Sequence, residues 1–467
     1  MSIDAYLISF VLFLAFAGWY RWRTTRLPEG VPQHRQPLRH TFRATVDSDI
    51  IYLRVFGTQI IVLNSQTAAN DLLSARSLLY SDRQVSMMVT ELLGWGRMAS
   101  TMPYRPAWRT SRHAIWQEFN PNNLSNHRPK QLWHARDLIR RLLTTPDDFL
   151  HHIDYTLAAS VIALTYGINV KPEHDPTIER GKKALRQLQK AAIAGTYLVD
   201  LIPILKHVPS WMPGAGFKAY AEQVLPDTIA MIDIPYNEGC SLIREGNGGE
   251  SLLSRNLARV ADSNYDHAHN TEIIKDVAAQ RKGQEELDKV ASSRLPSFED
   301  LPHMPYVQAI MLEVLRWQAV LPLGLAHRLT IDDEYKGYYI PKGSIVFANI
   351  WAMLRDEEYY PDPDVFRPEG FLKDGKINYK LTNPIPNFGF GRRICPGRYF
   401  AMDSLWISIA SILATFDIEK AKDEQGQDIE PDIQWIPGFS RQLRRFKCSI
   451  TARSAEAIKL IKDSELA

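Results

Sequence analysis

The stretch NFGFGRRICPGRYFA, Asn387 to Ala401, carries the most informative chemistry of the chain. Its glycines surround a single cysteine, Cys395, and an apolar helical run from Phe400 to Phe416 follows. Glycine permits unusual φ angles and close backbone approach, which a loop wrapped under a flat cofactor needs. A cysteine just before a helix gains from amide dipoles that favour its thiolate. The pattern therefore predicts a metal-ligating thiolate, and the alternative is a buried structural cysteine in a glycine-rich loop.

Composition limits the classes of protein that this chain can be. Its 467 residues are 45% hydrophobic and 23% charged, which is typical of a globular protein with one large domain or two to three smaller ones. The 55 basic and 53 acidic residues give a formal charge of +2 with no long basic block, so nucleic-acid binding has no electrostatic support. Three scattered cysteines exclude a disulfide framework and indicate a reducing compartment.

The N-terminus predicts a membrane anchor. The run AYLISFVLFLAFAGWY, Ala5 to Tyr20, has no charge, and Arg21, Arg23 and Arg26 follow it. A cleaved signal peptide, the alternative, would carry its positive charges before the apolar run. Because arginines stay on the cytosolic side, we expect residues 3–22 to span the membrane once and leave the rest of the chain in the cytosol.

Periodicity predicts a mostly helical domain with a small β-sheet region, the α+β class. Val46 to Asn64 has two β-branched runs around a glycine, which is a hairpin signal. Helical apolar spacing covers residues 149–166, 177–197 and 304–317, and short strands are expected in 335–348. No Walker loop and no G-x-G-x-x-G fingerprint after a strand is present, so a nucleotide-binding fold is not indicated.

The cysteine loop also contains a basic residue in a useful place. Thiolate ligation of haem iron requires an anionic sulfur, amide donors and a basic partner for the haem carboxylates. Arg393 lies two residues before Cys395 and can be that partner.

With these residues in view, the chain resembles the cytochrome P-450 haem-thiolate monooxygenases. The family pattern F-x-x-G-x-R-x-C-x-G is met in full by Phe388, Gly391, Arg393, Cys395 and Gly397, and Cys395 is by this resemblance the iron ligand. The resemblance covers the chain from Asp49 onward and is closest to membrane-bound fungal members.

Three further features resemble the family. Glu313 and Arg316 form its Glu-x-x-Arg, and their i to i+3 spacing lets them pair on one helix face. Trp108 and Arg112 are similar to its W-x-x-x-R helix, whose indole and guanidinium reach a haem propionate. His327 falls where the family often has another propionate donor, although a plain loop histidine is the alternative.

The resemblance implies a single catalytic domain, residues 49–467, with haem b between a distal and a proximal helix. It implies reduction by an NADPH-dependent cytochrome reductase, splitting of dioxygen and hydroxylation of a lipophilic small molecule, for which we expect a fungal secondary metabolite such as a terpenoid. The location implied is the endoplasmic reticulum membrane. The expected pocket walls are Glu91 to Tyr104, Thr196 to Gly216 and Val320 to Ala326, which are rich in apolar residues.

One essential family element is missing from the sequence. The helix that begins near IIKDVAA, from Ile273, should continue with [AG]-G-x-[DE]-T-[ST], whose acid and alcohol deliver protons to iron-bound dioxygen. Instead QRKGQEELDKV follows at once and resembles a segment two helices later. The junction between Ala279 and Gln280 thus lacks roughly 30 residues, about 45 Å of helix. No residue is a candidate for proton delivery.

Two other departures are smaller. The hinge after the anchor, residues 23–48, is shortened, and Gly370 replaces the arginine that completes a triad with Glu313 and Arg316. Arg367 is close in sequence, but the sequence does not establish that it substitutes. Three interpretations follow: a monooxygenase from an incomplete gene model or skipped exon, a haem-thiolate isomerase, dehydratase or peroxygenase-like enzyme that needs no acid-alcohol pair, or a haem-binding protein without turnover.

Overall fold

The computed structural model describes residues 48–255 and 277–464, apart from residues 56, 85, 173, 194–195, 201, 248–250, 292, 382–384 and 437–439. The predicted anchor, 3–22, and the predicted hinge up to residue 47 lie outside the described residues. Within the described part of the chain, no helix is both long enough and apolar enough to cross a membrane.

Helices make up most of the described chain. The longer ones are α4 (Pro106–Phe119), α5 (Arg128–Thr144), α6 (Phe149–Tyr166), α7 (Pro176–Ala191), α8 (Gly216–Arg244), α10 (Val277–Val290), α11 (Pro305–Trp317), α13 (Arg398–Thr415) and α14 (Ala455–Asp463). Short helices are α2 (Gln66–Ala69), α3 (Ser77–Tyr80) and α12 (Ile350–Met353). Single turns of other types include η1 (Asn70–Ala75), η2 (Met87–Leu92), η3 (Trp95–Arg97), η6 (Leu198–Asp200), η7 (Pro203–His207), η10 (Pro386–Phe388) and η11 (Gly391–Arg393).

Periodicity located several elements well. Apolar spacing predicted a helix over 149–166, which is α6, and over 304–317, where α11 begins one residue later. The helix predicted over 177–197 ends at Ala191 as α7, because the chain reaches Gly195 within one turn and glycine breaks helices.

The main sheet has five strands in the order β1-β2-β7-β4-β3. Its strands are β1 (Ile50–Val55), β2 (Thr58–Leu63), β7 (Ile345–Ala348), β4 (His327–Arg328) and β3 (Asp82–Arg83). β1 and β2 form the predicted hairpin, antiparallel with Ile50 opposite Leu63, and β2 pairs with β7 in parallel. The predicted strands of 335–348 are β6 (Tyr338–Ile340) and β7, and β6 pairs with β5 (Asp333–Tyr335) across the turn at Lys336-Gly337.

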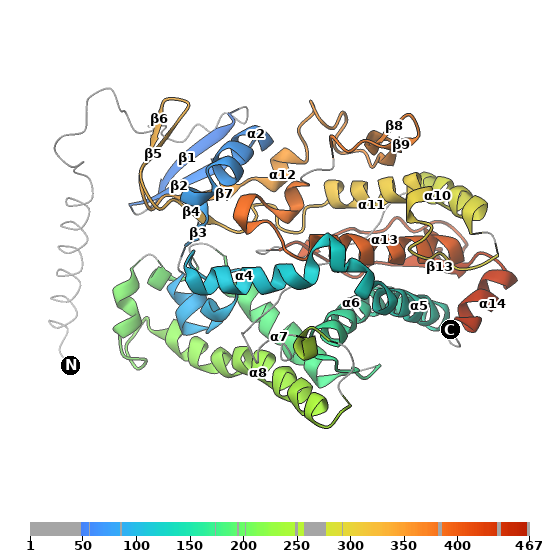
Figure 1. The fold of residues 1–467 in the computed structure, drawn as a ribbon, viewed down its shortest axis with the longest axis horizontal. Coiled ribbons are helices and arrows are strands. Elements are labelled where there is room, and N and C mark those ends of the chain that lie inside the picture. Colours follow the sequence, from blue (N-terminus) through green and yellow to red (C-terminus); the bar gives the residue numbers. More distant parts are fainter. Residues whose placement is uncertain are drawn as a thin grey trace.

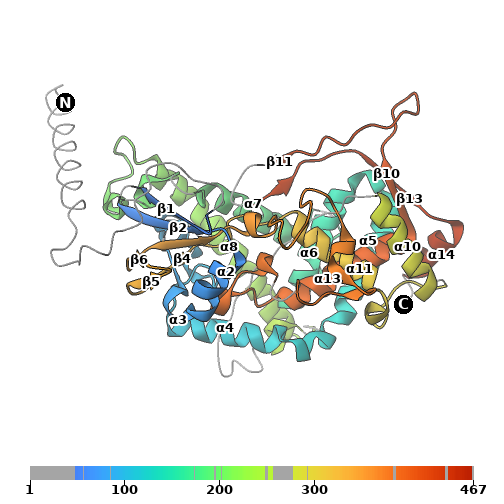
Figure 2. The ribbon, with the colours of Figure 1, turned by 90° about the horizontal axis from the view of Figure 1, so that it is seen from above.

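The sheet and the helical part occupy different ends of the molecule. In Figure 1 the sheet lies at one side, α10, α11 and α13 run side by side away from it, and α8 follows the opposite edge. Figure 2, turned by 90°, again shows α14 at the end farthest from the sheet. The largest helical core lies between α10, α11 and α13 and includes the fully buried Trp406, Ile407 and Val307. The segments before and after Cys395 thus pack against this core of helices.

The helix α10 runs without a break over Ala279 and Gln280. Ala279 is buried in the core with α11 and α13, and the Gln280 amide both donates to the Ile418 carbonyl (3.3 Å) and accepts from the Ile418 N–H (3.0 Å). Ile418 belongs to β10 (Phe416–Lys420), which pairs with β13 (Cys448–Ala452). Gln284, one turn later, donates to the Phe416 carbonyl (3.1 Å). The two glutamine side chains thus hydrogen-bond backbone groups of β10 that pair with no described strand. The part of α10 from Gln280 onward is therefore an integrated part of the fold.

Candidate active site

The cysteine loop connects η10 to α13. The Cys395 N–H donates to the Phe388 carbonyl (2.7 Å), which closes the loop, and Gly397 directly precedes the first residue of α13. The Arg398 guanidinium donates to the Cys395 carbonyl (3.2 Å). Phe388 itself packs against the core of α11 and α13. The residues of the predicted pattern therefore form one compact loop whose two ends are fixed by that core.

Gly391 is required by two features of this loop. Its φ of +56° lies in the left-handed region, and a Cβ at this position would come within 2.0 Å of the Leu73 carbonyl oxygen. Leu73 belongs to η1, so the glycine allows the cysteine loop to contact the segment that follows the main sheet. By contrast, a Cβ on Gly397 would meet no atom within 4 Å.

Opposing influences act on the Cys395 thiol. Burial raises its pKa above the ordinary value, because a thiolate loses hydration there. The Gly397 amide and the positive charges of Arg112 and Arg398 act in the opposite direction. The surroundings thus supply the amide and cationic partners of an anionic sulfur, and a bound metal ion would complete the stabilisation of the thiolate.

Arg393 is buried, and each of its three guanidinium nitrogens donates to a backbone oxygen. It donates to the carbonyls of Ser81 (2.8 Å), Met102 (2.8 Å) and Ala99 (3.2 Å). Its Cζ lies 4.1 Å from the centre of the Trp108 ring, and the Trp108 indole N–H donates to the same Ala99 carbonyl (3.1 Å). The structure therefore brings two predicted residues, one from the cysteine loop and one from α4, into direct contact.

His327 lies near Arg393, whose positive charge acts on its ring. It is buried in β4, and its Nδ1–H donates to the Tyr80 carbonyl (2.8 Å). Burial, together with the positive charges of Arg83 and Arg393, lowers the pKa of His327 to about 3, so the ring is neutral at physiological pH. The residue is thus fixed in one orientation with a defined tautomer.

Arg83 is a member of this group that the sequence did not single out. It is buried in β3 and donates to the carbonyls of Ser100 (3.0 Å), Leu325 (2.8 Å) and Ala326 (2.8 Å). Its charge lowers the pKa of Arg393 and of His327, which places the three side chains close together. No motif distinguishes Arg83 from the other arginines, and only the sheet brings it here.

The charges of this region fit a ligand with several negative groups. Buried Arg83 and Arg393 lie close together, and Arg112 on α4 is near enough for its charge to lower the pKa of both Arg393 and the half-buried Cys395 thiol. Burial and the charges of Arg83 and Arg112 lower the pKa of Arg393, and Asp82 and Tyr104 act in the opposite direction. Excess buried positive charge is costly without an anionic partner, and the two carboxylates of a haem would supply such a partner while its iron would bind the thiolate. The residues present therefore fit haem.

Comparison with known proteins agrees with this geometry. The sequence model of the family described as cytochrome P-450 matches residues 271–447. Cytochrome P-450 monooxygenase ple1 of Rhodocybe pseudopiperita is 37% identical, with 89% of this chain and 85% of that protein covered. Cytochrome P-450 monooxygenase 98 of Postia placenta is 40% identical, with 90% and 86% covered. The chain belongs to the cytochrome P-450 family. It is therefore an oxidoreductase of the monooxygenase type, with the family's thiolate-bound haem iron.

This cytochrome P-450 is shorter than a third relative. Tryptamine 4-monooxygenase of Psilocybe cyanescens is 35% identical, and the comparison covers 97% of this chain and 99% of that protein. The alignment of the two sequences runs over 503 positions, more than the 467 residues of the whole chain. Part of the relative consequently has no counterpart here.

The described chain is interrupted before α10. The chain leaves the described part at Arg255, whose guanidinium pairs with Glu118 of α4 (3.0 Å), and it resumes at Val277. Ile273 to Asp276, the start of the stretch that precedes the predicted junction, lie outside the described residues. Within 48–255 and 277–464 no long helix lies between α8 and α10.

The predicted Glu-x-x-Arg residues form a buried pair away from the thiol. Arg316 donates to Glu313 through two nitrogens (2.6 and 2.8 Å) and to the carbonyls of Leu354, Pro363 and Val365. The third partner of Glu313 is a backbone group, because the Arg367 N–H donates to it (2.6 Å). The Arg367 side chain instead pairs with Asp362 at the surface (2.8 Å), so only its amide contacts Glu313.

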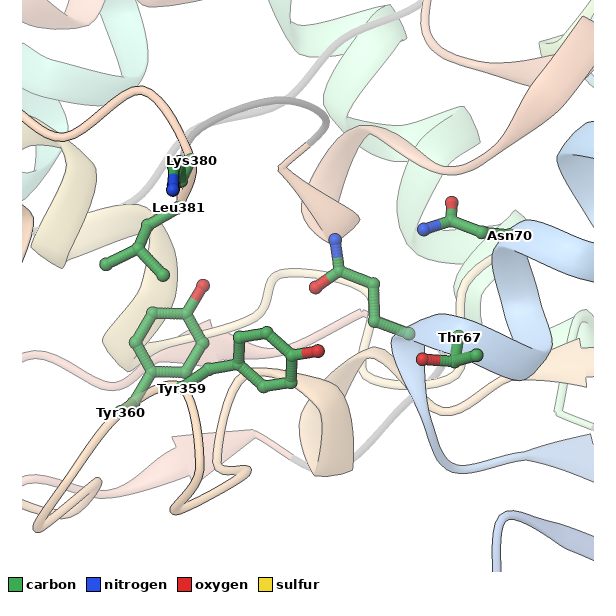
Figure 3. A pocket seen from close by; sticks show the side chains of 7 residues that line it. Thr67, Asn70, Tyr359, Tyr360, Lys380 and Leu381 are labelled. Atoms are coloured by element: carbon green, nitrogen blue, oxygen red, sulfur yellow. The ribbon is translucent and has the colours of Figure 1, made fainter.

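A small pocket lies beside this pair, not beside the thiol. It encloses about 100 Å³ between α2 and the segment that precedes the cysteine loop, and in Figure 3 Tyr359, Tyr360 and Leu381 lie across it from Thr67 and Asn70. Tyr360 also contacts Arg316, whose Cζ is 5.6 Å from the ring centre. Pockets for small molecules enclose about 300–1,000 Å³. This one is therefore too small for a lipophilic substrate.

The three predicted substrate walls do not come together at one place in the described chain. Leu93, Trp95 and Met98 of the first wall are buried in an apolar cluster with α7 and α8. The second wall, from Thr196, contributes Val199 to the same cluster. The third, Val320 to Ala326, contacts Arg83 through its last two carbonyls. The structure thus joins the first two walls and leaves the third beside the cationic group.

Proposed function

We propose that this cytochrome P-450 carries haem b and hydroxylates a lipophilic small molecule of fungal secondary metabolism, such as a terpenoid. Dioxygen and electrons from an NADPH–cytochrome reductase would be its co-substrates. The observation that carries the proposal is the closed cysteine loop, whose Cys395 lies beside buried cations that match the charges of haem. The name of one relative, tryptamine 4-monooxygenase, refers to tryptamine, so an indole amine belongs in the panel of test substrates.

We assign the residue roles in the same proposal. Cys395 would ligate the iron, and Arg393 and Arg112 would hold the haem carboxylates. Trp108 and His327 position the segments around them, because their N–H groups donate to the Ala99 and Tyr80 carbonyls. When bound, haem supplies the activation of dioxygen, with electron donation from the thiolate. Three further residues shape the loop. The Phe388 carbonyl closes it by accepting from the Cys395 N–H, and the lack of a side chain at Gly391 permits its contact with η1. The Gly397 amide donates toward the sulfur.

The test of the ligand is spectroscopic. The full-length protein, purified with haem, should give the thiolate-type shift of the reduced carbon monoxide complex, and Cys395→Ser should abolish it. Cys448→Ser, which changes a partly buried cysteine of β13, is the matched control and should keep the shift. An unchanged spectrum in Cys395→Ser would refute the assignment.

We also propose that residues 3–22 anchor the protein in the endoplasmic reticulum membrane, with residues 49–467 in the cytosol. The charge order at Arg21 to Arg26 supports this orientation. Membrane vesicles treated with protease from the cytosolic side should lose the catalytic domain. Protection of the domain would contradict the orientation.

The junction at Ala279 and Gln280 suggests that the sequence lacks an exon of a working monooxygenase. The long comparison with tryptamine 4-monooxygenase and the missing acid-alcohol pair support this proposal. Sequencing the transcript should reveal in-frame codons there for a glycine- or alanine-rich helix with Asp or Glu followed by Thr. A transcript as written would contradict it.

The absent proton-delivery pair favours a second candidate function. A chain of this length could bind haem without turnover, or catalyse an isomerisation or dehydration that consumes no dioxygen. NADPH-dependent product formation with a reductase separates the cases, because only a monooxygenase incorporates oxygen from dioxygen into the product.

A further inference from the structure

The small pocket between α2 and the segment before the cysteine loop is lined almost entirely by hydrogen-bonding groups. The polar residues of its lining are Gln66, Thr67, Asn70, Tyr359, Tyr360 and Lys380. Lys380 is the one charged residue among the described lining residues, so the lining carries a positive charge and no carboxylate. Figure 3 shows Lys380 and the two tyrosines on one side of the pocket and Thr67 and Asn70 on the other.

Most of these side chains have no polar partner within the described chain. Neither a hydrogen bond nor an ion pair is made there by the Lys380 ammonium, the Asn70 amide or the hydroxyls of Thr67, Tyr359 and Tyr360. Burial raises the pKa of Tyr360 to about 12, so its hydroxyl stays protonated at neutral pH. Ammonium, amide and protonated hydroxyl groups all donate hydrogen bonds. The pocket therefore presents donors from both sides to a ligand with several acceptor oxygens.

The acidic groups that act on this region already have partners. Glu313 and Asp356 both raise the pKa of Tyr360. Glu313 is paired with Arg316 (2.6 Å), and the Asp356 carboxylate accepts a backbone N–H (3.0 Å). Lys380 makes no ion pair with any carboxylate of the described residues. The charge of Lys380 is thus not neutralised by the described part of the protein, and a local positive charge attracts an anion.

The volume of the pocket selects a small ligand. Its 100 Å³ correspond to about three molecules of liquid water, which leaves room for an oxyanion of about five heavy atoms. A nucleotide or a lipophilic molecule would need several times this volume. A tetrahedral oxyanion presents acceptor oxygens in every direction, and lysine is a common partner of phosphate in proteins.

We propose that this pocket binds a compact oxyanion of the phosphate class. Lys380 supplies the charge, and Asn70, Tyr359 and Tyr360 donate hydrogen bonds to its oxygens. The pocket lies away from the thiol, so this binding does not depend on the monooxygenase chemistry.

A bound anion connects two supports of the cysteine loop. Asn70 is the first residue of η1, whose Leu73 carbonyl lies against Gly391. Tyr360 packs against both the apolar core at the main sheet and the core between α10, α11 and α13, and its ring centre is 5.6 Å from the Arg316 Cζ. An occupied pocket therefore joins η1 to the segment around the buried ion pair. A ligand that binds only the folded protein also raises its stability.

The test is titration calorimetry of the full-length protein in detergent with inorganic phosphate, at an ionic strength held constant with chloride. Wild-type protein should bind phosphate saturably with a Kd of about 1 mM or lower. Lys380→Gln should weaken binding about tenfold, because hydrogen bonds from a charged donor are the strong ones, and Tyr360→Phe about threefold. Lys376→Gln is the matched control, since Lys376 is an exposed lysine of β9 (Lys376–Ile377) outside the pocket, and it should leave the affinity unchanged.

Two further measurements separate this site from other effects of phosphate. Phosphate stabilises many proteins because it is excluded from their surface. The rise of the urea midpoint in phosphate should therefore be larger in the wild type and in Lys376→Gln than in Lys380→Gln. Glycerol phosphate, which has the head of a phospholipid, should bind more weakly than inorganic phosphate because it exceeds the pocket volume. Tighter binding of glycerol phosphate would support the phosphate site and assign it to an ester.

Two results would overturn the proposal. One is the absence of saturable phosphate binding in the wild type. The other is an affinity of Lys380→Gln equal to that of the wild type, with circular dichroism showing that both proteins are folded. Because Lys380 is exposed, its replacement should leave the fold intact.

Discussion

The buried pair of Glu313 and Arg316 allows a sharp test of the fold. Both side chains are at most 3% exposed, and Arg316 bridges Glu313 and three backbone carbonyls of the segment before the cysteine loop. Arg316→Met removes the charge and leaves the Glu313 carboxylate buried with only the Arg367 amide as a described partner. Breaking a buried pair by removal of one partner costs about 3–5 kcal/mol. We expect a loss of that size in the free energy of unfolding.

The assay is urea unfolding of the full-length protein in detergent, followed by helical circular dichroism. The change is read as a shift of the midpoint at constant slope. Arg367→Ala is the matched control, because its side chain makes only an exposed pair with Asp362, worth about 0–1 kcal/mol. Its backbone amide, which contacts Glu313, remains.

Two results would refute this reasoning. An Arg316→Met protein as stable as the wild type would show that the carbonyls and carboxylate find other partners. A loss in Arg367→Ala as large as that in Arg316→Met would show that the Arg367 side chain, not its amide, completes the group.

Three further changes have clear expected outcomes. Gly391→Ala should prevent haem retention, because its Cβ would lie only 2.0 Å from the Leu73 carbonyl oxygen. Gly370→Ala, which has open space around the added Cβ, should leave haem retention unchanged. Equal haem content in the two variants would contradict the steric argument. Gln280→Ala should lower the free energy of unfolding by about 1–3 kcal/mol, because it leaves the Ile418 carbonyl and N–H of β10 without their partner. Glu285→Ala, at an exposed position of the same helix, should not change it. The urea midpoint is again the measurement. Burial lowers the pKa of His327 to about 3, so the folded protein does not bind the proton that the unfolded chain binds below about pH 6.5. The free energy of unfolding should therefore decrease as pH is lowered from about 6.5 to 3, by up to about 1.4 kcal/mol per pH unit. His327→Gln should reduce this slope, and an unchanged slope would count against the buried neutral ring.

Local signals in the sequence were sufficient for several elements. The hairpin of β1 and β2, the helices α6 and α11, and the loop before α13 were predictable because each depends on neighbours within a few residues. The pairing of Glu313 with Arg316 was predictable for the same reason, since three residues separate them on one helix. The resemblance to cytochrome P-450 proteins rested on the spacing around Cys395, and the comparisons confirm the family.

Only the tertiary structure decided the partners of these residues. The main sheet brings Arg83 to Arg393, and η1 comes so close to Gly391 that no side chain fits there. The hydrogen bond from the Arg367 amide to Glu313 could not be predicted, because it depends on where a backbone group points. The sequence by itself determined the family, the thiol and the absence of an acid-alcohol pair, since these are properties of residue order. The cluster of buried arginines beside Cys395 results from contacts between distant segments, which residue order does not specify.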